Sequence, residues 1–451
     1  MRPVLLCYLI PSVLGLTRTR DWQVGDPCPE SLKTTIPGGD WDYNGQGKES
    51  PKFKTMQSVH SALSTCPNIT ALDLRVTLLG CSEWPDRWNF PFELDGGDKY
   101  QPLTTLRLEG YKVGEAPWRK VQLQTYEESY IPLPARLYDW WRWGNMAKYF
   151  RYKKLPEEQR NKTNLELWFD AMDWSKIETL AVRELSGQHY FLDEAASRLG
   201  SLKDLEIWGA SNNTLAFITS LEPKSLTNLT WIDGWEAGAL DTILDHHGQS
   251  LRHLDIHSHE SGKSPSPAFS NAQLRSLVDK APNLNYLSIN VHRNGTWPFE
   301  VFDTIASVPS LESVDLMFDI TSDCQRQKPE RYTVSYADWE RINQHRNGSL
   351  ICQGEEQFQQ PVITEKSSLE IFRFMREKNV GKRVKSVTFW AGDWTRGWDG
   401  PLYIPPWIEG RRVKVSCTTE GKAEGEAWCT TVAGNGYWKA DAPKFEDEDD
   451  Y

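Results

Sequence analysis

Histidines and carboxylates gather in one short stretch of this 451-residue chain, and such groups can hold a metal ion. Two spacing arguments oppose that chemistry. If His253, Asp255 and His257 alternate along a β-strand, the outer histidines start about 13 Å apart, whereas zinc needs each nitrogen at about 2.0–2.1 Å. The residues after His259 do not form a His-Glu-x-x-His helix. We therefore expect a polar surface with no metal and no cofactor. The stretch contains His246, His247, His253, His257 and His259, with Asp245, Asp255 and Glu260 nearby.

Tryptophans and carboxylates provide the strongest candidate for catalysis. The chain has 21 Trp, against 16 Tyr and 16 Phe, and several of them surround Asp393 and Asp399. Aromatic rings pack on sugars, and two carboxylates about 5–9 Å apart can hydrolyse a glycosidic bond. A carbohydrate-active hydrolase using Asp393 and Asp399 is therefore one alternative. The simpler interpretation is that the tryptophans seal the ends of a repeat stack. They cluster as Trp390, Trp394, Trp398 and Trp407, and as Trp140, Trp141 and Trp143.

Other functional classes lack support in the sequence. The chain contains no Gly-x-Ser-x-Gly and no Gly-x-Gly-x-x-Gly, and Gly262-Lys263-Ser264 lacks the upstream Gly of a phosphate loop. The net charge of −11, from 51 basic and 62 acidic residues, disfavours nucleic-acid binding. No run of 18 apolar residues follows the first residues, so we expect no membrane span. These observations favour a non-enzymatic binding protein.

The N-terminus has the layout of a secretory signal peptide. Arg2 precedes an apolar stretch from Val4 to Ile10, and small residues before position 16 suggest cleavage after Gly15. An apolar first helix is disfavoured because polar residues 17–21 follow at once. Six Asn-x-Ser/Thr sequons agree with a glycosylated, extracellular or cell-wall protein. They begin at Asn68, Asn161, Asn212, Asn228, Asn294 and Asn347.

Seven cysteines remain after removal of the signal peptide, and an oxidising compartment favours their pairing. Cys28 is left over from pairs of close neighbours: it is either free or takes the place of one partner in the first pair. The sequence leaves both options open. The neighbouring pairs are Cys66 with Cys81, Cys324 with Cys352, and Cys417 with Cys429.

A repeated pattern of apolar-x-x-apolar-x-apolar runs along the chain. Between residues 177 and 311 its starts differ by 25, 24, 25, 33 and 27 residues, and most intervals contain a short amphipathic helix. The helices are expected at 191–199, 239–244, 271–280 and 299–306. The triplets are Ile69-Leu72-Leu74, Leu103-Leu106-Leu108, Ile177-Leu180-Val182, Leu202-Leu205-Ile207, Leu226-Leu229-Trp231, Leu251-Leu254-Ile256, Leu284-Leu287-Ile289, Leu311-Val314-Leu316 and Val384-Val387-Phe389.

These nine triplets resemble the helix-containing leucine-rich-repeat superfamily. The resemblance covers roughly residues 66–390 and implies an α/β horseshoe solenoid with a parallel sheet on its concave side. The stretch 165–180 is also similar to filamentous-fungal repeat proteins, some of them labelled F-box-like. Because a secretion signal stands where the F-box helices would lie, we do not infer a ubiquitin-ligase role.

The expected organisation follows from these segments. A signal peptide (1–15) and an N-terminal cap (16–65) precede the solenoid (66–390), which has a Trp-rich insertion at 111–161 and a loop at 320–365. A disulfide-bonded C-terminal cap (391–440) and an acidic tail (441–451) follow.

Strand alternation predicts which side chains face the concave surface. They combine carboxylates with aromatic and soft apolar groups, which suits a protein or glycan partner better than a phosphate. A structural role in a cell wall is a further alternative, and the oligomeric state is left open. A glycan on Asn228 would obstruct the middle of this surface. The predicted binding residues are Glu206, Trp208, Asp255, His257, Asn290, Asp315 and Met317.

Overall fold

The computed structural model describes seven segments of the chain: 21–36, 53–76, 90–118, 145–326 (without 186, 210–212, 237 and 261–263), 358–392, 412–421 and 426–434. Several predicted features lie outside them and stay predictions. These are the signal peptide, Cys81, Cys352, Asn212, Asn347, Trp140, Trp141, Trp143, Asp393, Trp394, Trp398, Asp399, Trp407 and the acidic tail.

One sheet of twelve strands runs through the described part of the chain, with the strands in the order of the sequence. The first ten are parallel, and the last two add as antiparallel strands. The predicted α/β architecture with a parallel sheet is thereby confirmed. The strands are β1 (Ser31–Ile36), β2 (Ala71–Val76), β3 (Thr105–Glu109), β4 (Thr179–Arg183), β5 (Asp204–Trp208), β6 (Asn228–Ile232), β7 (His253–His257), β8 (Tyr286–Asn290), β9 (Ser313–Phe318), β10 (Ser386–Gly392), β11 (Arg412–Thr418) and β12 (Trp428–Gly434).

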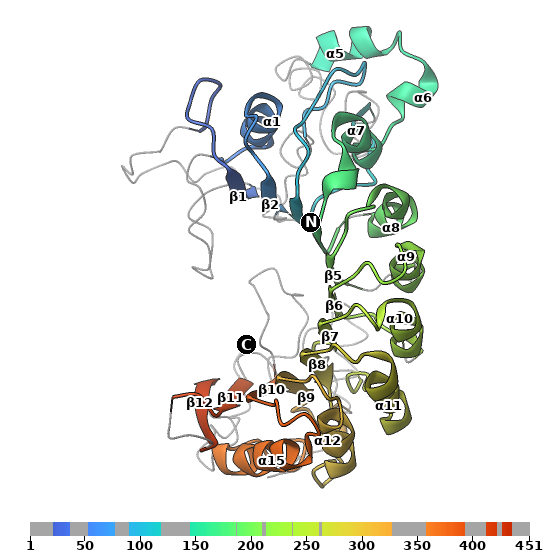
Figure 1. Ribbon diagram of the computed structural model, residues 1–451. Helices are drawn as coiled ribbons and strands as arrows, with labels where there is room; N and C mark the ends of the chain where they lie inside the picture. Colours follow the sequence, from blue (N-terminus) through green and yellow to red (C-terminus); the bar gives the residue numbers. More distant parts are fainter. Residues whose placement is uncertain are drawn as a thin grey trace, which may run out of the picture.

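The helices lie on the outer side of this sheet, and the whole forms an arch with the strands on its inner side (Figure 1). Such an arrangement of sequential strand and helix layers is consistent with a repeat solenoid. Among the described residues, no helix has the length and hydrophobicity to cross a membrane. The helices are α1 (Met56–Thr65), α5 (Asn145–Tyr152), α6 (Glu157–Arg160), α7 (Asn164–Ala171), α8 (Gln188–Ala195), α9 (Thr214–Ser220), α10 (Ala239–His247), α11 (Asn271–Lys280), α12 (Phe299–Ala306), α13 (Asp323–Arg326) and α15 (Glu365–Lys378), with short 3-10 turns η2 (Trp174–Lys176) and η3 (Ala196–Arg198).

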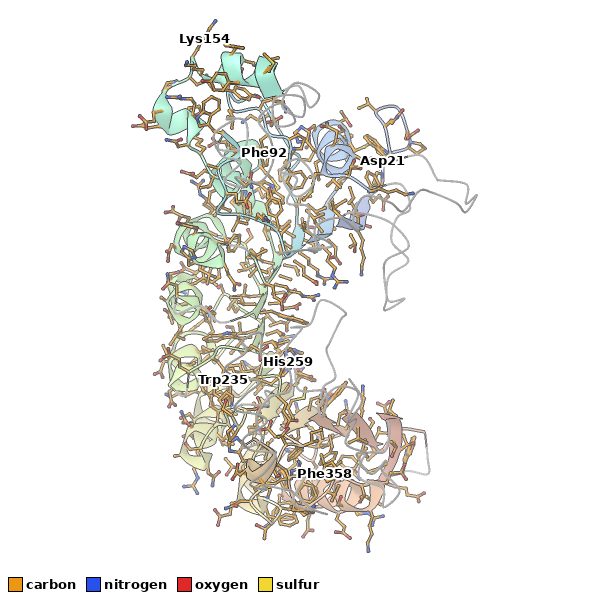
Figure 2. All side chains as sticks on the ribbon, turned by 180° about the vertical axis from the view of Figure 1, so that it is seen from behind. Asp21, Phe92, Lys154, Trp235, His259 and Phe358 are labelled. Carbon is orange, nitrogen blue, oxygen red and sulfur yellow. A yellow bond between two sulfur atoms is a disulfide. The ribbon has the colours of Figure 1, made fainter. Side chains whose placement is uncertain are left out.

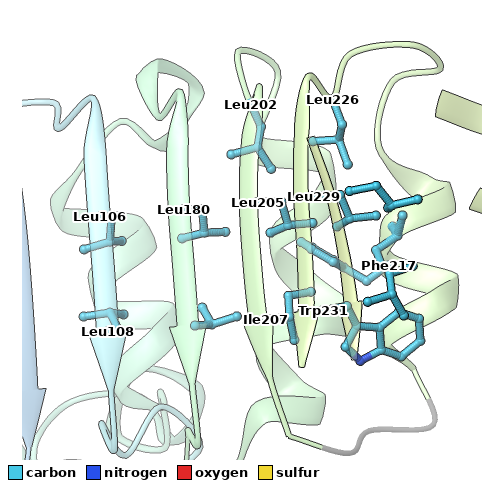
Figure 3. Packing of buried hydrophobic residues seen from close by; sticks show 14 of the residues in the cluster. Leu106, Leu108, Leu180, Leu202, Leu205, Ile207, Phe217, Leu226, Leu229 and Trp231 are labelled. Atoms are coloured by element: carbon cyan, nitrogen blue, oxygen red, sulfur yellow. The ribbon is translucent and has the colours of Figure 1, made fainter. Parts of the chain in front are cut away.

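The apolar triplets form the core between the strands and the helices. Their middle residues pair laterally from strand to strand and are at most 2% exposed. Figure 3 shows part of this row, with Phe217 of α9 packing from the helix side. Burying one such Leu contributes about 1.5–3 kcal/mol, so the repeated row holds each strand to the helix layer. It consists of Leu72, Leu106, Leu180, Leu205, Leu229, Leu254, Leu287, Val314 and Val387.

All four helices expected from the spacing are present. The bounds of α11 and α12 agree with the expectation, whereas α8 begins three residues earlier than expected and α10 ends three residues later. Helix starts are marked by capping boxes, in which a Ser or Thr side chain accepts a backbone N–H that lacks a partner within the helix. These boxes pair Thr55 with Ser58, Thr163 with Glu166, Ser270 with Gln273, and Thr364 with Ser367.

The long interval between the second and third triplets does not add a strand, because β3 pairs directly with β4. Its described part supplies α5, α6 and α7. An aromatic cluster anchors it: the Trp168 ring lies 4.9 Å from Phe90 and 5.5 Å from Tyr111, and all three side chains are buried. At least part of the aromatic surplus therefore serves packing near the N-terminal end of the arch.

The sheet extends beyond the predicted solenoid at both ends. Strand β1 precedes residue 66, and its alternating Leu32, Thr34 and Ile36 are buried without matching the triplet. At the other end, β11 and β12 form a hairpin on β10, and the predicted disulfide Cys417–Cys429 joins two directly paired positions. The described part of the predicted C-terminal cap therefore belongs to the same sheet.

The predicted pairing of Cys66 with Cys81 is wrong, because Cys66 is bonded to Cys28 with a Cα–Cα distance of 5.4 Å. The reason is the parallel pairing of β1 and β2. Cys28 and Cys66 precede these neighbouring strands, so they lie at the same edge of the sheet, whereas Cys81 follows β2. Cys324 is also disulfide-bonded, and its pairing with Cys352 stays a prediction because Cys352 lies outside the described residues.

Peptide mapping without reduction should recover Cys28 and Cys66 in one linked peptide. Closing a loop of 38 residues stabilises the folded state by about 4 kcal/mol in the chain-entropy model. The double variant Cys28→Ser/Cys66→Ser should therefore lose up to that amount in denaturant unfolding. A peptide linking Cys66 to Cys81 would contradict the structure.

A second prediction concerns the turn after β3. Gly110 has φ +67°, and a Cβ there would lie 2.2 Å from the carbonyl oxygen of Val76, whereas Gly96 has φ +84° and no atom within 4 Å. Gly96→Ala should cost about 1 kcal/mol from backbone strain alone. Gly110→Ala should cost about 2 kcal/mol more, because the end of β2 must shift. Equal losses in chemical denaturation would show that this close approach is absent.

Candidate functional site

The concave face consists of three rows of side chains that cross the strands. On β5 the three rows contain Asp204, Glu206 and Trp208, respectively. The structure brings the predicted residues together because equivalent positions pair laterally: Glu206 is opposite Thr230, which is opposite Asp255, and Trp208 is opposite Ile232, which is opposite His257. Glu206, Trp208, Asp255, Asp315 and Met317 are half-buried, while His257 and Asn290 are only 5% and 4% exposed. The predicted residues therefore share a face but differ in access to solvent.

Ion pairs connect the concave side chains of β1 to β5. Arg75 lies 2.7 Å from Glu109, and Arg183 lies 3.6 Å from Glu109 and 2.6 Å from Glu206. In the next row, Asp73 lies 3.7 Å from Lys33 and 4.0 Å from Arg107. We call this set the charge ladder. Each of its carboxylates has a Lys or Arg partner, so this half of the face is largely neutralised.

Trp208 lies where the charge ladder ends. The Arg183 guanidinium is 4.8 Å from the centroid of its ring and also donates from Nε to Glu206 at 2.6 Å. The Trp208 ring contacts His259 edge-on at 6.0 Å between centroids. Its indole nitrogen is buried without a hydrogen-bond partner among the described residues. Trp208 is thus held between a cation and a histidine.

Two Asp–His pairs adjoin this tryptophan. His257 Nδ1 lies 2.6 Å from Asp255, His259 Nδ1 lies 2.7 Å from Asp233, and the two imidazole centroids are 5.7 Å apart. Burial lowers the pKa of His257, but the hydrogen bond to Asp255 and nearby carboxylates outweigh it and leave this pKa raised. Each carboxylate fixes the orientation of its imidazole. Figure 2 shows His259 on the strand side of the arch.

Asp233 occupies a turn position that glycine fills on other strands. Gly110 and Gly209 directly follow β3 and β5 with positive φ, and Asp233 follows β6 with φ 61°. A non-glycine residue pays a steric cost there. Asp233 has compensating contacts: it accepts both the backbone N–H and the imidazole of His259, which lower the pKa of Asp233 although burial opposes ionisation.

Asn290 has a structural role within the site. Its Oδ1 accepts the Ser258 N–H at 2.6 Å, and its Nδ2 donates to the Ser258 carbonyl at 2.9 Å. The Asn290 side chain therefore makes the two hydrogen bonds to Ser258 that the backbone of a neighbouring strand would otherwise make. Because both ends of the amide are used, Asn290 holds Ser258, the residue after His257, rather than offering a free group to a partner.

A second aromatic group lies further along the face. His253 of β7 stacks on Tyr286 of β8 with 4.1 Å between centroids and 5° between planes. Trp390 of β10 donates from its indole nitrogen to Asp315 at 3.0 Å, and Lys414 lies 3.9 Å from the Trp390 centroid. Burial raises the pKa of Asp315 and lowers that of His253.

The histidine-rich stretch does not form the single polar surface that the sequence predicts, because His247, His257 and Glu260 are buried. His246 and His247 of α10 contact the helix layer, where their Nε2 atoms lie 2.9 Å from the Leu221 carbonyl and 3.0 Å from the Ile218 carbonyl. They therefore connect α10 to the end of α9. Among the described residues, no group of three or more His, Cys, Asp or Glu side chains is arranged to hold a metal ion.

Sequence reasoning missed a buried polar network at the edge where β7 to β9 end. Glu260 accepts the backbone N–H groups of Ile320 and Thr321 at 2.8 and 2.6 Å, and Asp319 accepts from the backbone and side chain of Ser266. The unusual interval of 33 residues between two triplets is the one signal that marks this place, since Glu260 and Ser266 lie within it. The extra residues of this interval therefore make polar contacts at the edge of the sheet.

The described sequons differ in accessibility. Asn68, Asn161 and Asn294 are exposed, whereas Asn228 is half-buried in β6. The Asn228 side chain donates from Nδ2 to Asp204 at 2.5 Å. The nitrogen that would carry a glycan is therefore in use on the concave face.

Comparison with known proteins assigns no family to this chain. No protein-family model matches the chain, and no curated protein matches it. A function has to be argued from the concave face itself.

The buried network predicts a dependence of stability on pH. Burial, with Asp319 adding to it, raises the pKa of Glu260 from 4.5 to about 7. Folded Glu260 therefore binds a proton more tightly than unfolded Glu260, so its contribution is greatest below pH 4.5 and is lost as pH rises to about 7. The loss is at most about 3 kcal/mol.

Chemical denaturation at several pH values between 4.5 and 8 tests this. Glu260→Gln keeps an uncharged side chain at every pH, so the variant should lose less stability than the wild type over this range. The exposed Glu222→Gln serves as the control and should leave the wild-type profile unchanged. Parallel profiles for wild type and Glu260→Gln would contradict the raised pKa.

Proposed function

We propose that this protein is a secreted glycoprotein that binds a protein or glycan partner on its concave face, without catalysis. We also propose that it is a leucine-rich-repeat-like solenoid, as its triplets suggest. One observation carries the binding role: half-exposed aromatic and carboxylate side chains lie in adjacent rows on one extended sheet face, around Trp208. Solenoids use such surfaces for recognition.

The chemistry of this face supports recognition by contact. Trp208 offers a large ring with little conformational freedom, since Arg183 and His259 already hold it. Rigid aromatic side chains are enriched among residues that dominate binding energy. The Asp–His pairs add polar groups whose orientation is fixed before a partner arrives. Both features reduce the entropy lost on binding.

A binding assay with matched variants tests the proposal. The purified chain without residues 1–15 is measured against immobilised oligosaccharides and synthetic peptides, and Trp208→Ala should weaken any saturable binding by at least about 30-fold, a typical hot-spot effect. Tyr190→Ala on α8 removes a half-exposed ring from the helix side and should not change affinity. Thermal melting verifies that both variants are folded.

Equal affinities of wild type and Trp208→Ala would show that the concave face around Trp208 is not the binding surface. Secretion is measured separately, by the N-terminal sequence of protein recovered from the medium, which should begin at residue 16. Mature protein that hydrolyses polysaccharide, and loses this activity in Asp393→Ala or Asp399→Ala, would contradict the absence of catalysis.

A further inference from the structure

The concave face divides into two halves that treat their carboxylates differently. In the charge ladder of β1 to β5, Asp73, Glu109 and Glu206 each lie within 4.0 Å of a Lys or Arg nitrogen. From β5 to β10 the three rows, all described, contain no Lys or Arg at all. Their carboxylates other than Glu206 are Asp204, Asp255 and Asp315. We call these three the Asp set: no Lys or Arg of the rows neutralises them, and Asp255 is paired with His257.

Hydrogen bonds hold two of these carboxylates without cancelling their charge. Asp204 accepts from the Thr179 hydroxyl at 3.2 Å and from the Asn228 amide, and Asp315 accepts from the Trp390 indole. All of these donors are neutral. Such bonds fix a carboxylate in place and lower its cost of desolvation, but the negative charge stays on the face. Asp255 differs in having His257 as its partner.

The His253–Tyr286 ring stack lies among the residues of the Asp set. His253 is influenced electrostatically by Asp204 and Asp255, and Tyr286 by Asp255 and Asp315. Burial lowers the pKa of His253, which favours a neutral imidazole at pH 7. A neutral ring stack bordered by carboxylates suits a cation, because the ring face and the negative groups both attract it.

A buried hydroxyl supports the ring stack from within the same row. Ser288 lies in the row between Asp255 and Asp315 and is fully buried. Its polar neighbour is the Tyr286 hydroxyl, which interacts with both Ser288 and Asp315. Because Ser288 is fully buried, it helps to hold Tyr286 in place and does not itself contact a partner.

We propose that the concave face of β5 to β9 binds a partner protein through a segment that carries Lys or Arg, with the cationic side chains at Asp204, Asp255 and the His253–Tyr286 stack. This inference rests on the proposed function and narrows it to one class of partner. Charge complementarity is the argument for this occupant: Lys and Arg neutralise the first half of the face, whereas the described rows from β5 to β10 hold carboxylates with no Lys or Arg and with His257 as the partner of Asp255. A neutral glycan would leave that charge uncompensated.

The test uses the full chain without residues 1–15 and an array of synthetic peptides with lysine or arginine at varied spacing. Each peptide has a matched analogue with acetyl-lysine or citrulline, which keeps the shape and removes the charge. The cationic peptides should bind and the neutral analogues should not. Raising the salt concentration from about 50 to about 500 mM should weaken binding, because screening shortens the range of the attraction.

Isosteric variants locate the binding. Asp204→Asn and Asp255→Asn should each weaken binding of a cationic peptide about fivefold, the effect of one partly exposed ion pair. Asp73→Asn removes the same charge from the charge ladder and should leave the affinity unchanged. Thermal melting shows that each variant is folded. Asp255→Asn also alters the hydrogen bond to His257, so the Asp204→Asn result decides. An Asn at 204 keeps one oxygen that accepts from Asn228, and its amide nitrogen can donate to the Thr179 hydroxyl.

Three results would overturn the inference: equal binding of charged and neutral peptides, an equal effect of Asp204→Asn and Asp73→Asn, or no peptide binding at all. A fourth result, saturable binding of a neutral oligosaccharide that Trp208→Ala abolishes, would overturn the inference while leaving the proposed function intact. The two failures are thereby distinguishable.

Discussion

The lateral register of the parallel strands is the constraint on which the rest of the structure depends. Each strand pairs with the next at equivalent positions, so that Leu205 lies opposite Leu229 and Glu206 opposite Thr230. Side chains alternate between the two faces of a strand. A slip of one residue would move the core row to solvent and the polar rows into the core. The apolar triplet therefore fixes both the core and the concave face.

This register also turns distant residues into neighbours. Arg183 and Glu206 are 23 residues apart in sequence, yet they form an ion pair because β4 and β5 are adjacent. The same relation places Trp208 beside Arg183 and stacks His253 on Tyr286. The chemistry of the face is thus set by the order of residues at one position across the repeats, rather than by any local motif.

Spacing alone was sufficient for β2 to β10 and for their rows, because both follow from the period of the triplets, whereas β1, β11 and β12 lack it. It was insufficient wherever a contact depends on a turn or a loop. Asp233 and Glu260 follow strands in irregular segments, and only the structure shows that Asp233 holds His259 and that Glu260 caps two backbone N–H groups. The pairing of Cys66 with Cys81 was wrong for a similar reason, since the partner of Cys66 was decided by β1, a strand that lacks the triplet. Of the two options left open for Cys28, the replacement of one partner of the first pair is the one found. Asn290 looked like a binding residue, but its amide closes the end of β7.

The way in which a carboxylate is satisfied decides what it can contribute. Asp73 lies between Lys33 and Arg107, so its charge is neutralised within the protein. Asp204 is held by Thr179 and Asn228, which satisfy its oxygens and leave its charge. Because Asn228 Nδ2 is both the donor to Asp204 and the atom that would carry a glycan, a sugar there would replace one of its hydrogens directly beside this carboxylate. Glycosylation of Asn228 and access of a cation to Asp204 are therefore opposed by the geometry of a single hydrogen bond.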